Sequence, residues 1–180
     1  MQKLLVVVDY QNDFVDGALG FKTAKDLEKP ICDKIKEYLD NEYKVIFTYD
    51  THFENYLNTR EGKNLPIKHC EINTFGHELY GDLKRFINNK NVINYNKESF
   101  GISPEGMLKI YREIGEVETI EIVGVVTNMC VISNVIMFQA QYTDADIIID
   151  AKLCASFDDE LHEKALDVAE SLQVKVINRK

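Results

Sequence analysis

The sequence predicts an α/β fold: a doubly wound, six-stranded parallel sheet in the order 3-2-1-4-5-6, with helices on both faces. Short aliphatic runs of strand length alternate with segments of helical period along the chain, as in a parallel sheet covered by its crossover helices. The first run is apolar at every position, the pattern of a strand buried on both faces. With 180 residues, 45% of them hydrophobic, the chain can bury a large core, and we expect a single domain over residues 1–180.

The first third of the chain predicts a strand, a helix and a second strand. The first strand covers Leu4 to Val8 and ends at Asp9, and two glycines then mark a loop. Aliphatic residues next recur at every fourth position, with Pro30 early in the segment, which predicts an amphipathic helix. These residues are Leu27, Ile31, Ile35 and Leu39. The second strand follows at Lys44–Tyr49.

The middle of the chain begins with a long connection. Residues 50–75 have little periodicity, and a loop of this length in a compact domain is usually functional or disordered. A short helix at Leu79–Ile87 and a third strand at Asn91–Tyr95 follow. Ser103 and Pro104 have the residue types of a helix cap and a first helical position, so a helix should begin there and end near Ile114.

The last part predicts three strands and two helices. Residues 120–123 form the fourth strand, and a helix with Ile132, Val135, Ile136 and Phe138 on its apolar face follows. The fifth strand covers residues 145–149. Ser156 to Asp159 have the spacing of a capping box, with Ser156 as the cap of a last helix. The sixth strand covers residues 174–177.

Composition excludes several classes of function. The formal charge of −9 argues against nucleic acid or an anionic membrane as a partner, so a small-molecule ligand is expected. Met1 to Val8 is too short for a signal peptide or a membrane span, which predicts a cytoplasmic protein. The four cysteines are scattered without a C-x-x-C pair, so neither disulfides nor a thiolate zinc site is indicated. There is no glycine-rich phosphate loop, and no nucleotide cofactor is expected.

Cys130 is the first candidate for catalysis. It follows the fourth strand within the first turn of a buried helix, where the helix dipole and free backbone N–H groups would lower the thiol pKa and could hold an oxyanion. In the predicted strand order, the sheet reverses between the first and fourth strands, and ligands bind at such a point. Asp9 and Cys130 would therefore share one crevice. The alternative is that Cys130 only fills space in the core.

Asp9 and Lys97 could complete a catalytic group. A cysteine nucleophile needs a base, and a carboxylate beside it disfavours the thiolate unless a cation restores the balance. Asp9 is the candidate base, and Lys97, just past the third strand, is the candidate cation. Taken alone, Asp9 could be a turn residue and Lys97 a solvated lysine.

A second group of residues could bind a metal. Asp50 and His52 lie two residues apart at the end of the second strand, on the same side of an extended chain, and His69 and Glu61 lie further along the same loop. Such oxygen and nitrogen ligands suit zinc, iron or manganese. The alternative is a polar loop with exposed histidines.

Phe14 and Phe100 could contact a flat ring, as could Phe21 or Phe53, although aromatic residues are more often core. We expect His77 and His162 to be structural or solvated, with His162 on the exposed side of the last helix.

Together, four segments resemble the isochorismatase-like cysteine hydrolases, with the nicotinamidases as the nearest branch. They are the residues from Asp9 to Phe14, from Asp50 to His52, around Lys97, and from Gly124 to Val131, and they occur in order across nearly the whole chain. The resemblance implies the isochorismatase-like hydrolase fold. It also implies catalytic roles for Asp9, Lys97 and Cys130.

The resemblance extends to the rest of the site. It implies a cis peptide between Val125 and Val126, with the N–H groups of Val126 and Cys130 forming the oxyanion hole. It places metal ligands at Asp50, His52 and His69, in one branch also at Glu61, and matches Phe14 to an aromatic residue that stacks on the substrate ring. Zinc is the first choice of metal, with iron and manganese as alternatives.

The function implied is a nicotinamidase-like amidohydrolase that acts on nicotinamide or a similar small carboxamide through a cysteine thioester. The alternatives are a hydrolase of the same family acting on another amide or carbamoyl compound, and a non-catalytic binding module of the same fold. Isochorismatase activity does not use the nucleophilic cysteine and fits less well. Nicotinamidases often stack the substrate on a tryptophan, and this chain contains none. A homo-oligomer is an expectation from the resemblance.

Overall fold

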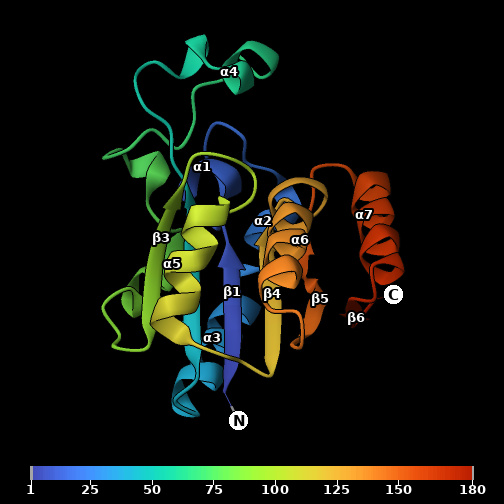
Figure 1. Cartoon of the computed structure of the whole chain (residues 1–180). Helices are drawn as coiled ribbons and strands as arrows, with labels where there is room; N and C mark the ends of the chain where they lie inside the picture. Colours follow the sequence, from blue (N-terminus) through green and yellow to red (C-terminus); the bar gives the residue numbers. More distant parts are fainter. Residues whose placement is uncertain (1, 180) are drawn as a thin grey trace.

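The computed structural model describes residues 2–179 and contains one six-stranded sheet in the order β3-β2-β1-β4-β5-β6. Every neighbouring pair of strands is parallel, which confirms the predicted topology (Figure 1). The strands are β1 (Lys3–Val8), β2 (Lys44–Asp50), β3 (Val92–Lys97), β4 (Thr119–Val125), β5 (Asp146–Ala155) and β6 (Lys175–Ile177).

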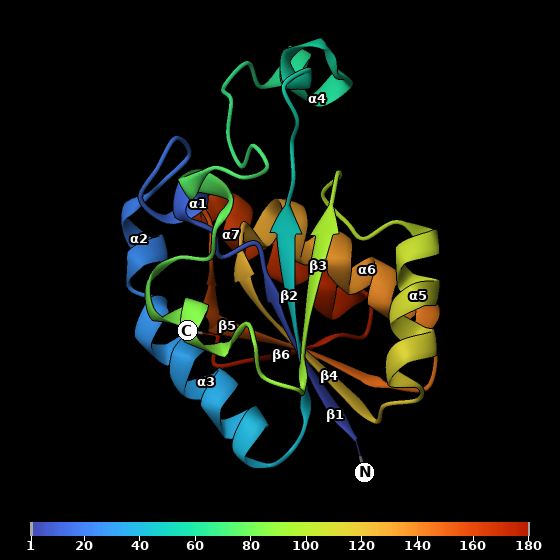
Figure 2. The ribbon, with the colours of Figure 1, turned by 90° about the vertical axis from the view of Figure 1, so that its left-hand side faces the viewer.

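Helices cover both faces of this sheet, as Figure 2 shows. On one face lie the short helices α1 (Asn12–Val15) and α2 (Lys22–Lys25) together with α3 (Glu28–Asp40). On the other lie α5 (Pro104–Ile114), α6 (Ile132–Gln141) and α7 (Asp159–Ser171). None of the helices within residues 2–179 combines the length and the apolar character that crossing a bilayer requires.

The side chains of β1 divide the core into two layers. Leu4, Val6 and Val8 pack beneath α5 and α6, whereas Leu5 and Val7 pack beneath α3, and all five are fully buried. Full burial of such a side chain contributes about 1.5–3 kcal/mol. The continuous aliphatic run is therefore explained by burial on both faces, as predicted.

An arm projects beyond the carboxyl ends of the strands. This arm, residues 51–68, contains a 3₁₀ turn at Tyr56–Asn58 and the short helix α4 (Arg60–Asn64). It stands above the end of β2 (Figures 1 and 2). The aperiodic segment in the sequence thus forms a separate layer over the edge of the sheet where ligands bind in folds of this type.

The predicted helix at Leu79–Ile87 is wrong in type and in extent. The segment forms a 3₁₀ helix at Gly81–Phe86, after another 3₁₀ turn at Phe75–His77. Leu79 instead forms an antiparallel bridge with Gln11, and the Tyr80 N–H donates to the Tyr10 carbonyl. These bonds hold residues 79–80 in extended backbone, so an α-helix cannot begin there.

The cap of the last helix also differs from the prediction. Asp158 caps α7 by accepting from the Leu161 N–H, whereas Ser156 Oγ donates to Asn128 Oδ1. The Ser156 side chain cannot cap the helix because β5 continues to Ala155 and places this hydroxyl beside Asn128. The predicted end of the strand, at residue 149, is therefore too early. The cap predicted for α5 is confirmed: Ser103 accepts from the Gly106 N–H, and Pro104 is the first helical residue.

Candidate active site and metal centre

The ends of four adjacent strands bring the candidate residues together. Asp9 follows β1, Asp50 and Lys97 are the last residues of β2 and β3, and Cys130 follows β4. Asp50 pairs directly with Lys97 in the β2–β3 register. Because the strands are parallel, all four side chains reach the same edge of the sheet.

Asp9, Lys97 and Cys130 are in direct contact. Lys97 Nζ lies 2.6 Å from Asp9 Oδ2 and 3.7 Å from Cys130 Sγ. The three residues are only 0%, 3% and 5% exposed, respectively. Thr48 donates to the second oxygen of Asp9 at 2.6 Å, and Lys97 also donates to the Ser99 carbonyl at 3.0 Å. A carboxylate, an ammonium and a thiol therefore form one buried group of fixed orientation.

Burial changes the proton affinity of all three groups. It raises the pKa of the Cys130 thiol well above its ordinary value; the Lys97 ammonium opposes this rise, and Asp9 adds to it. Burial also raises the pKa of Asp9 in spite of Lys97. Burial would lower the pKa of Lys97, but Asp9, Cys130 and Asp50 together outweigh it, so the pKa of Lys97 is raised. The thiol therefore rests protonated beside a carboxylate, and the lowered thiol pKa expected from the helix dipole is wrong.

The local backbone explains this difference. Cys130 lies in a π-helical turn, Thr127–Val131, that precedes α6, and not in the first turn of an α-helix. Turns of this kind often occur at functional sites. The thiol is so deeply buried there that loss of hydration outweighs a nearby positive dipole.

The turn is preceded by the cis peptide that the resemblance implies, between Val125 and Val126. Val126 and Cys130 both line one cavity, so their backbone N–H groups are candidates for an oxyanion hole.

Four further side chains form a candidate metal centre: Asp50, His52, Glu61 and His69 each offer one ligand atom, and these atoms lie within 4.8 Å of one another. Asp50 Oδ2 is 3.0 Å from His52 Nε2 and 3.4 Å from His69 Nε2. Two ligands bound to one metal ion at about 2.1 Å are separated by roughly 3.0–3.4 Å. The spacing therefore fits a divalent cation.

The hydrogen bonds around this cluster also fit a metal. His69 Nδ1 lies 2.8 Å from the Ile67 carbonyl, which directs Nε2 toward the cluster as in many metal sites. His52 Nε2 is buried without a hydrogen-bond partner among the described residues, although Asp50 is near. Both imidazoles thus direct a nitrogen to one common point.

Charge in the cluster favours a cation as well. Burial would lower the pKa of His52, but the neighbouring carboxylates of Asp50 and Glu61 raise it to about 9. At Asp50 the effect of burial is outweighed by Lys97 and the two histidines, which hold its pKa below the ordinary value. The cluster therefore attracts positive charge, which a proton or a metal ion can supply.

A cavity of about 660 Å³ connects the thiol to this cluster. Cys130, Asp50, His69 and Glu61 contribute its polar lining. Its apolar lining includes both predicted aromatic residues, Phe14 and Phe100, with Phe14 packing edge-on against His69. Leu19, Met129 and Phe157 also line it. They come from three separate segments of the chain, and no spacing in the sequence connects them.

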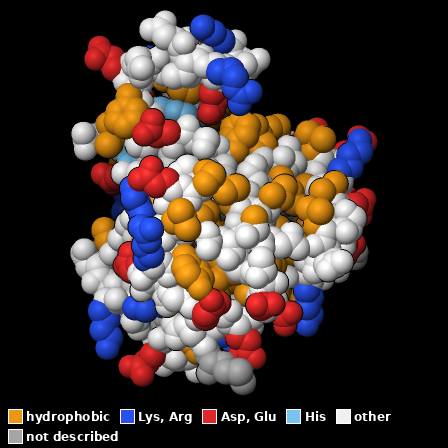
Figure 3. Space-filling view, viewed as in Figure 1, with side chains coloured by type: hydrophobic (Ala, Val, Ile, Leu, Met, Phe, Trp, Pro, Cys, Tyr) orange, Lys and Arg blue, Asp and Glu red, His pale blue; other side chains and the backbone are white. Residues whose placement is uncertain are grey.

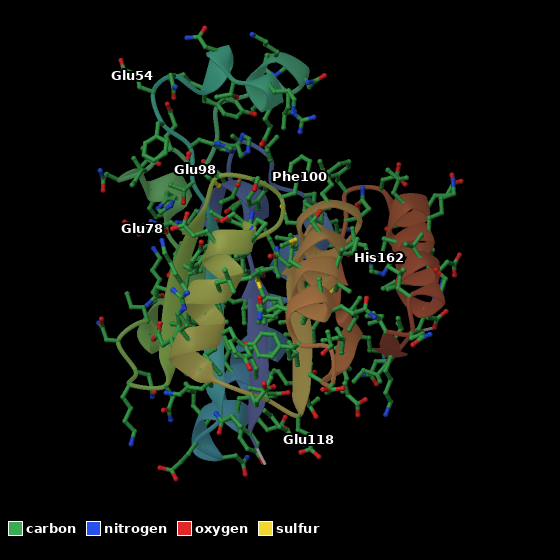
Figure 4. All side chains as sticks on the ribbon, in the orientation of Figure 1. Glu54, Glu78, Glu98, Phe100, Glu118 and His162 are labelled. Atoms are coloured by element: carbon green, nitrogen blue, oxygen red, sulfur yellow. The ribbon has the colours of Figure 1, made fainter. Side chains whose placement is uncertain are left out.

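The two remaining histidines are structural. His77 Nε2 lies 2.8 Å from Thr51 Oγ1, and its ring stacks on Tyr49. The prediction that His162 lies on the exposed side of α7 is wrong. Its Nδ1 lies 2.8 Å from Thr127 Oγ1, and Figure 4 shows it on the side of the helix that faces the body of the molecule. Sequence analysis missed this contact because the two residues are 35 positions apart.

Comparisons with known proteins agree with this geometry. The family model described as Isochorismatase domain matches residues 3–180. The isochorismatase family protein PncA of Bacillus subtilis is 30% identical over 176 residues, which cover 92% of this chain and 93% of that protein.

Solved structures are similar over almost the full length. The crystal structure of pyrazinamidase/nicotinamidase from Streptococcus mutans has a TM-score of 0.86 at 30% identity and covers 98% of this chain and 100% of that chain. The structure of pyrazinamidase of Pyrococcus horikoshii in complex with zinc has a TM-score of 0.84 at 25% identity. The match covers 99% of this chain and 100% of that chain.

Proposed function

Since this chain belongs to the isochorismatase family, we propose that it is a nicotinamidase-like amidohydrolase. It converts nicotinamide, or a similar small carboxamide, to the carboxylic acid and ammonia. The observation that carries the proposal is the buried contact of Lys97 with Asp9 and Cys130, beside a cavity that is lined by Cys130 and by three of the four candidate metal ligands. The similar proteins named as nicotinamidase or pyrazinamidase support the substrate class.

The first half of the reaction forms a thioester. Asp9 accepts the proton of Cys130, and the sulfur attacks the amide carbonyl carbon. The backbone N–H groups of Val126 and Cys130 hold the resulting oxyanion. Asp9 returns the proton to the amide nitrogen, the C–N bond breaks, and ammonia leaves.

The second half hydrolyses the thioester. Asp9 accepts a proton from water, and the hydroxide attacks the same carbon through a second oxyanion. The C–S bond then breaks, and the sulfur of Cys130 takes the proton back. Lys97 remains protonated throughout, because its raised pKa keeps its charge available to Asp9 and to the sulfur in turn.

Asp50, His52 and His69 would hold a divalent metal, with Glu61 as a further ligand. Zinc is the first choice, and iron and manganese suit the same donors. When bound, the metal supplies a Lewis acid that can hold a pyridine nitrogen of the substrate. Phe14 and Phe100 confine the ring between the cluster and the thiol, which orients the carbonyl toward sulfur. The cytoplasmic location and the homo-oligomer stay predictions.

The test is ammonia release from nicotinamide by the purified protein, with metal content measured on the same sample. We expect turnover in the wild type and in Cys32→Ala, which removes a buried cysteine of α3, and none in Cys130→Ala. No ammonia from a metal-loaded wild type would reject nicotinamide as the substrate, and a panel of other carboxamides would follow. Full turnover in Cys130→Ala would reject the thioester mechanism.

A further inference from the structure

Residues of the metal-ligand cluster line two different cavities. The cavity that contains Cys130 includes Asp50, His69 and Glu61 in its lining. A second cavity of about 530 Å³ includes His52 and, again, Glu61. The cluster is therefore accessible from two sides, and the proposed reaction uses only the side that faces the thiol.

The second cavity lies between the arm and the loop that follows β3. Asn55 lines it from the arm, and Glu98 and Phe100 line it from the loop. Figure 4 shows Glu98 and Phe100 at the end of the sheet that lies below the arm. In the space-filling view, histidine atoms are visible in the hollow beneath the arm (Figure 3). The metal ligands are thus reachable from this face of the molecule.

Phe100 lines both cavities, and the metal cluster lies between them. A substrate ring held near Phe14 and the cluster would fill the inner part of the first cavity. It would leave the second cavity open to water. An ion could then reach His52 and Glu61 without displacing the substrate.

Charge and hydrogen bonding in the second cavity suit a cation. Glu98 and Glu61 contribute two carboxylates, against one guanidinium from Arg60. His52 Nε2 is buried and has no hydrogen-bond partner among the described residues. A path lined in this way begins with an exposed carboxylate and ends at an unpartnered ligand atom.

We propose that the second cavity is the route by which the divalent cation enters and leaves its ligands, separately from the substrate. This inference rests on the metal centre of the proposed function. A residue that only lines a route changes the barrier, so it alters uptake and release by the same factor and leaves the metal Kd unchanged. A residue that forms the site changes the Kd.

Two tryptophan variants test the route. Asn55→Trp narrows the second cavity, and Asn64→Trp narrows the substrate cavity from the neighbouring helix α4, since each asparagine lines only its own cavity. Zn²⁺ uptake is followed with a colorimetric zinc indicator, and release is followed by transfer to excess chelator. The rate of Cys130 alkylation by iodoacetamide reports access to the substrate cavity and needs no turnover.

We expect Asn55→Trp to slow uptake and release roughly tenfold each, a barrier change of about 1.4 kcal/mol. Its Kd and its alkylation rate should equal those of the wild type. Asn64→Trp should show slower alkylation and wild-type metal kinetics. The opposite pattern, with metal exchange slowed only by Asn64→Trp, would show that the ion uses the substrate cavity and would overturn the inference.

Glu98→Gln gives a second test that does not depend on a bulky side chain. We expect it to slow Zn²⁺ uptake several-fold at low ionic strength and to have no effect at high salt, because attraction to the exposed carboxylate of Glu98 is screened. If Glu98→Gln takes up Zn²⁺ at low salt as fast as the wild type does, the role of Glu98 is overturned. If Asn55→Trp also does not fold, that result overturns the route itself. A protein that binds no Zn²⁺ at equilibrium would overturn the metal centre, while ammonia release would still test the amidase.

Discussion

At the scale of single residues, Lys97 connects the two groups that exchange a proton in the proposed reaction. Its ammonium contacts Asp9 and Cys130 within 3.7 Å, and the three side chains are shielded from water. Removal of one member of such a group leaves an uncompensated buried charge. The resting form is a thiol beside a carboxylate, so in the proposed reaction of the wild type Asp9 takes the proton as the sulfur attacks.

Asp9→Asn should separate reactivity of the sulfur from turnover. Burial is the main cause of the raised thiol pKa and remains in the variant, but the substitution removes the like charge of Asp9 that adds to it and leaves Lys97 to stabilise the thiolate. Alkylation of Cys130 near neutral pH should therefore become faster than in the wild type. Turnover should fall by roughly 10²–10⁴, the usual contribution of a general base. Alkylation rates and ammonia release are measured on the same preparation.

The exposed Asp144 provides a matched control, since Asp144→Asn makes the same chemical change away from the cavity. It should leave both rates unchanged. Retention of turnover in Asp9→Asn would show that another group accepts the proton.

His162 should make stability depend on pH. Burial lowers its pKa in the folded protein, although Glu163 and Asp159 oppose this and Arg179 adds to it. The unfolded chain takes up a proton near the ordinary value of about 6.5, whereas folded His162 resists protonation until a lower pH. Its contribution is therefore complete above about pH 6.5 and is lost as the pH falls through the folded pKa.

His162→Gln removes this titration and can keep a hydrogen bond to Thr127. We expect the free energy of unfolding in urea to fall less between pH 7.5 and pH 5.5 in the variant than in the wild type. His77 also has a lowered pKa, so the difference between the two proteins is the relevant quantity. An identical loss of stability in both would show that His162 does not contribute.

At the scale of elements, the sequence predicted the strands and their order because these depend on long-range burial. The run from Leu4 to Val8 must be covered on both faces, and alternation with helices then restricts the topology. The sheet brings Asp9, Lys97 and Cys130 together, so much of the site's geometry could be anticipated once the strand order was predicted.

Features that depend on particular contacts could not be predicted in this way. The cap at Asp158 replaces Ser156 because Ser156 bonds to Asn128 on another element. The raised thiol pKa depends on complete burial of Cys130, which a local dipole argument does not include. Phe157 is 62% exposed and still lines the cavity, and no periodicity distinguishes it from other surface residues.

Gly124 lies where β4 runs beside β1 without room for a side chain. It pairs with Val8, the residue before Asp9, and a Cβ at this position would lie 2.2 Å from the Val8 carbonyl oxygen. Its φ of 115° is also outside the usual range for other residues. Gly124→Ala should therefore destabilise the protein and displace Asp9.

Gly115→Ala is the matched control, because Gly115 also has a positive φ of 77° but no atom within 4 Å of an added Cβ. Both variants lose the conformational freedom of glycine, and only Gly124→Ala adds the clash. We expect Gly124→Ala to be less stable than Gly115→Ala by about 1–3 kcal/mol in urea unfolding, the usual range for overpacking. Ammonia release should fall in Gly124→Ala alone. Equal stabilities would show that β1 and β4 can separate without cost.

At the scale of the whole molecule, the arm and the sheet meet at the candidate metal centre. Asp50 and His52 lie where β2 leaves the sheet, and Glu61 and His69 lie in and just after the arm. An ion held by these four side chains would fasten the arm over the end of the sheet. It would also supply positive charge to a chain with a formal charge of −9.

Removal of the metal should therefore lower the stability of the whole protein and not only its activity. A ligand that binds the folded state alone stabilises it by about 2.7 kcal/mol at a free concentration of 100 times its Kd. We expect the thermal unfolding midpoint of chelator-treated protein to rise by several degrees on addition of Zn²⁺.

The variant His52→Ala should lose this response, because the unpartnered Nε2 of His52 is one of the ligand atoms. His77→Ala should keep it, because His77 lies outside the cluster and its side chain contacts Thr51 Oγ1. An equal response in both variants would mean that Zn²⁺ stabilises the protein at another position, and the arm would then have to be held over the sheet by its protein contacts alone.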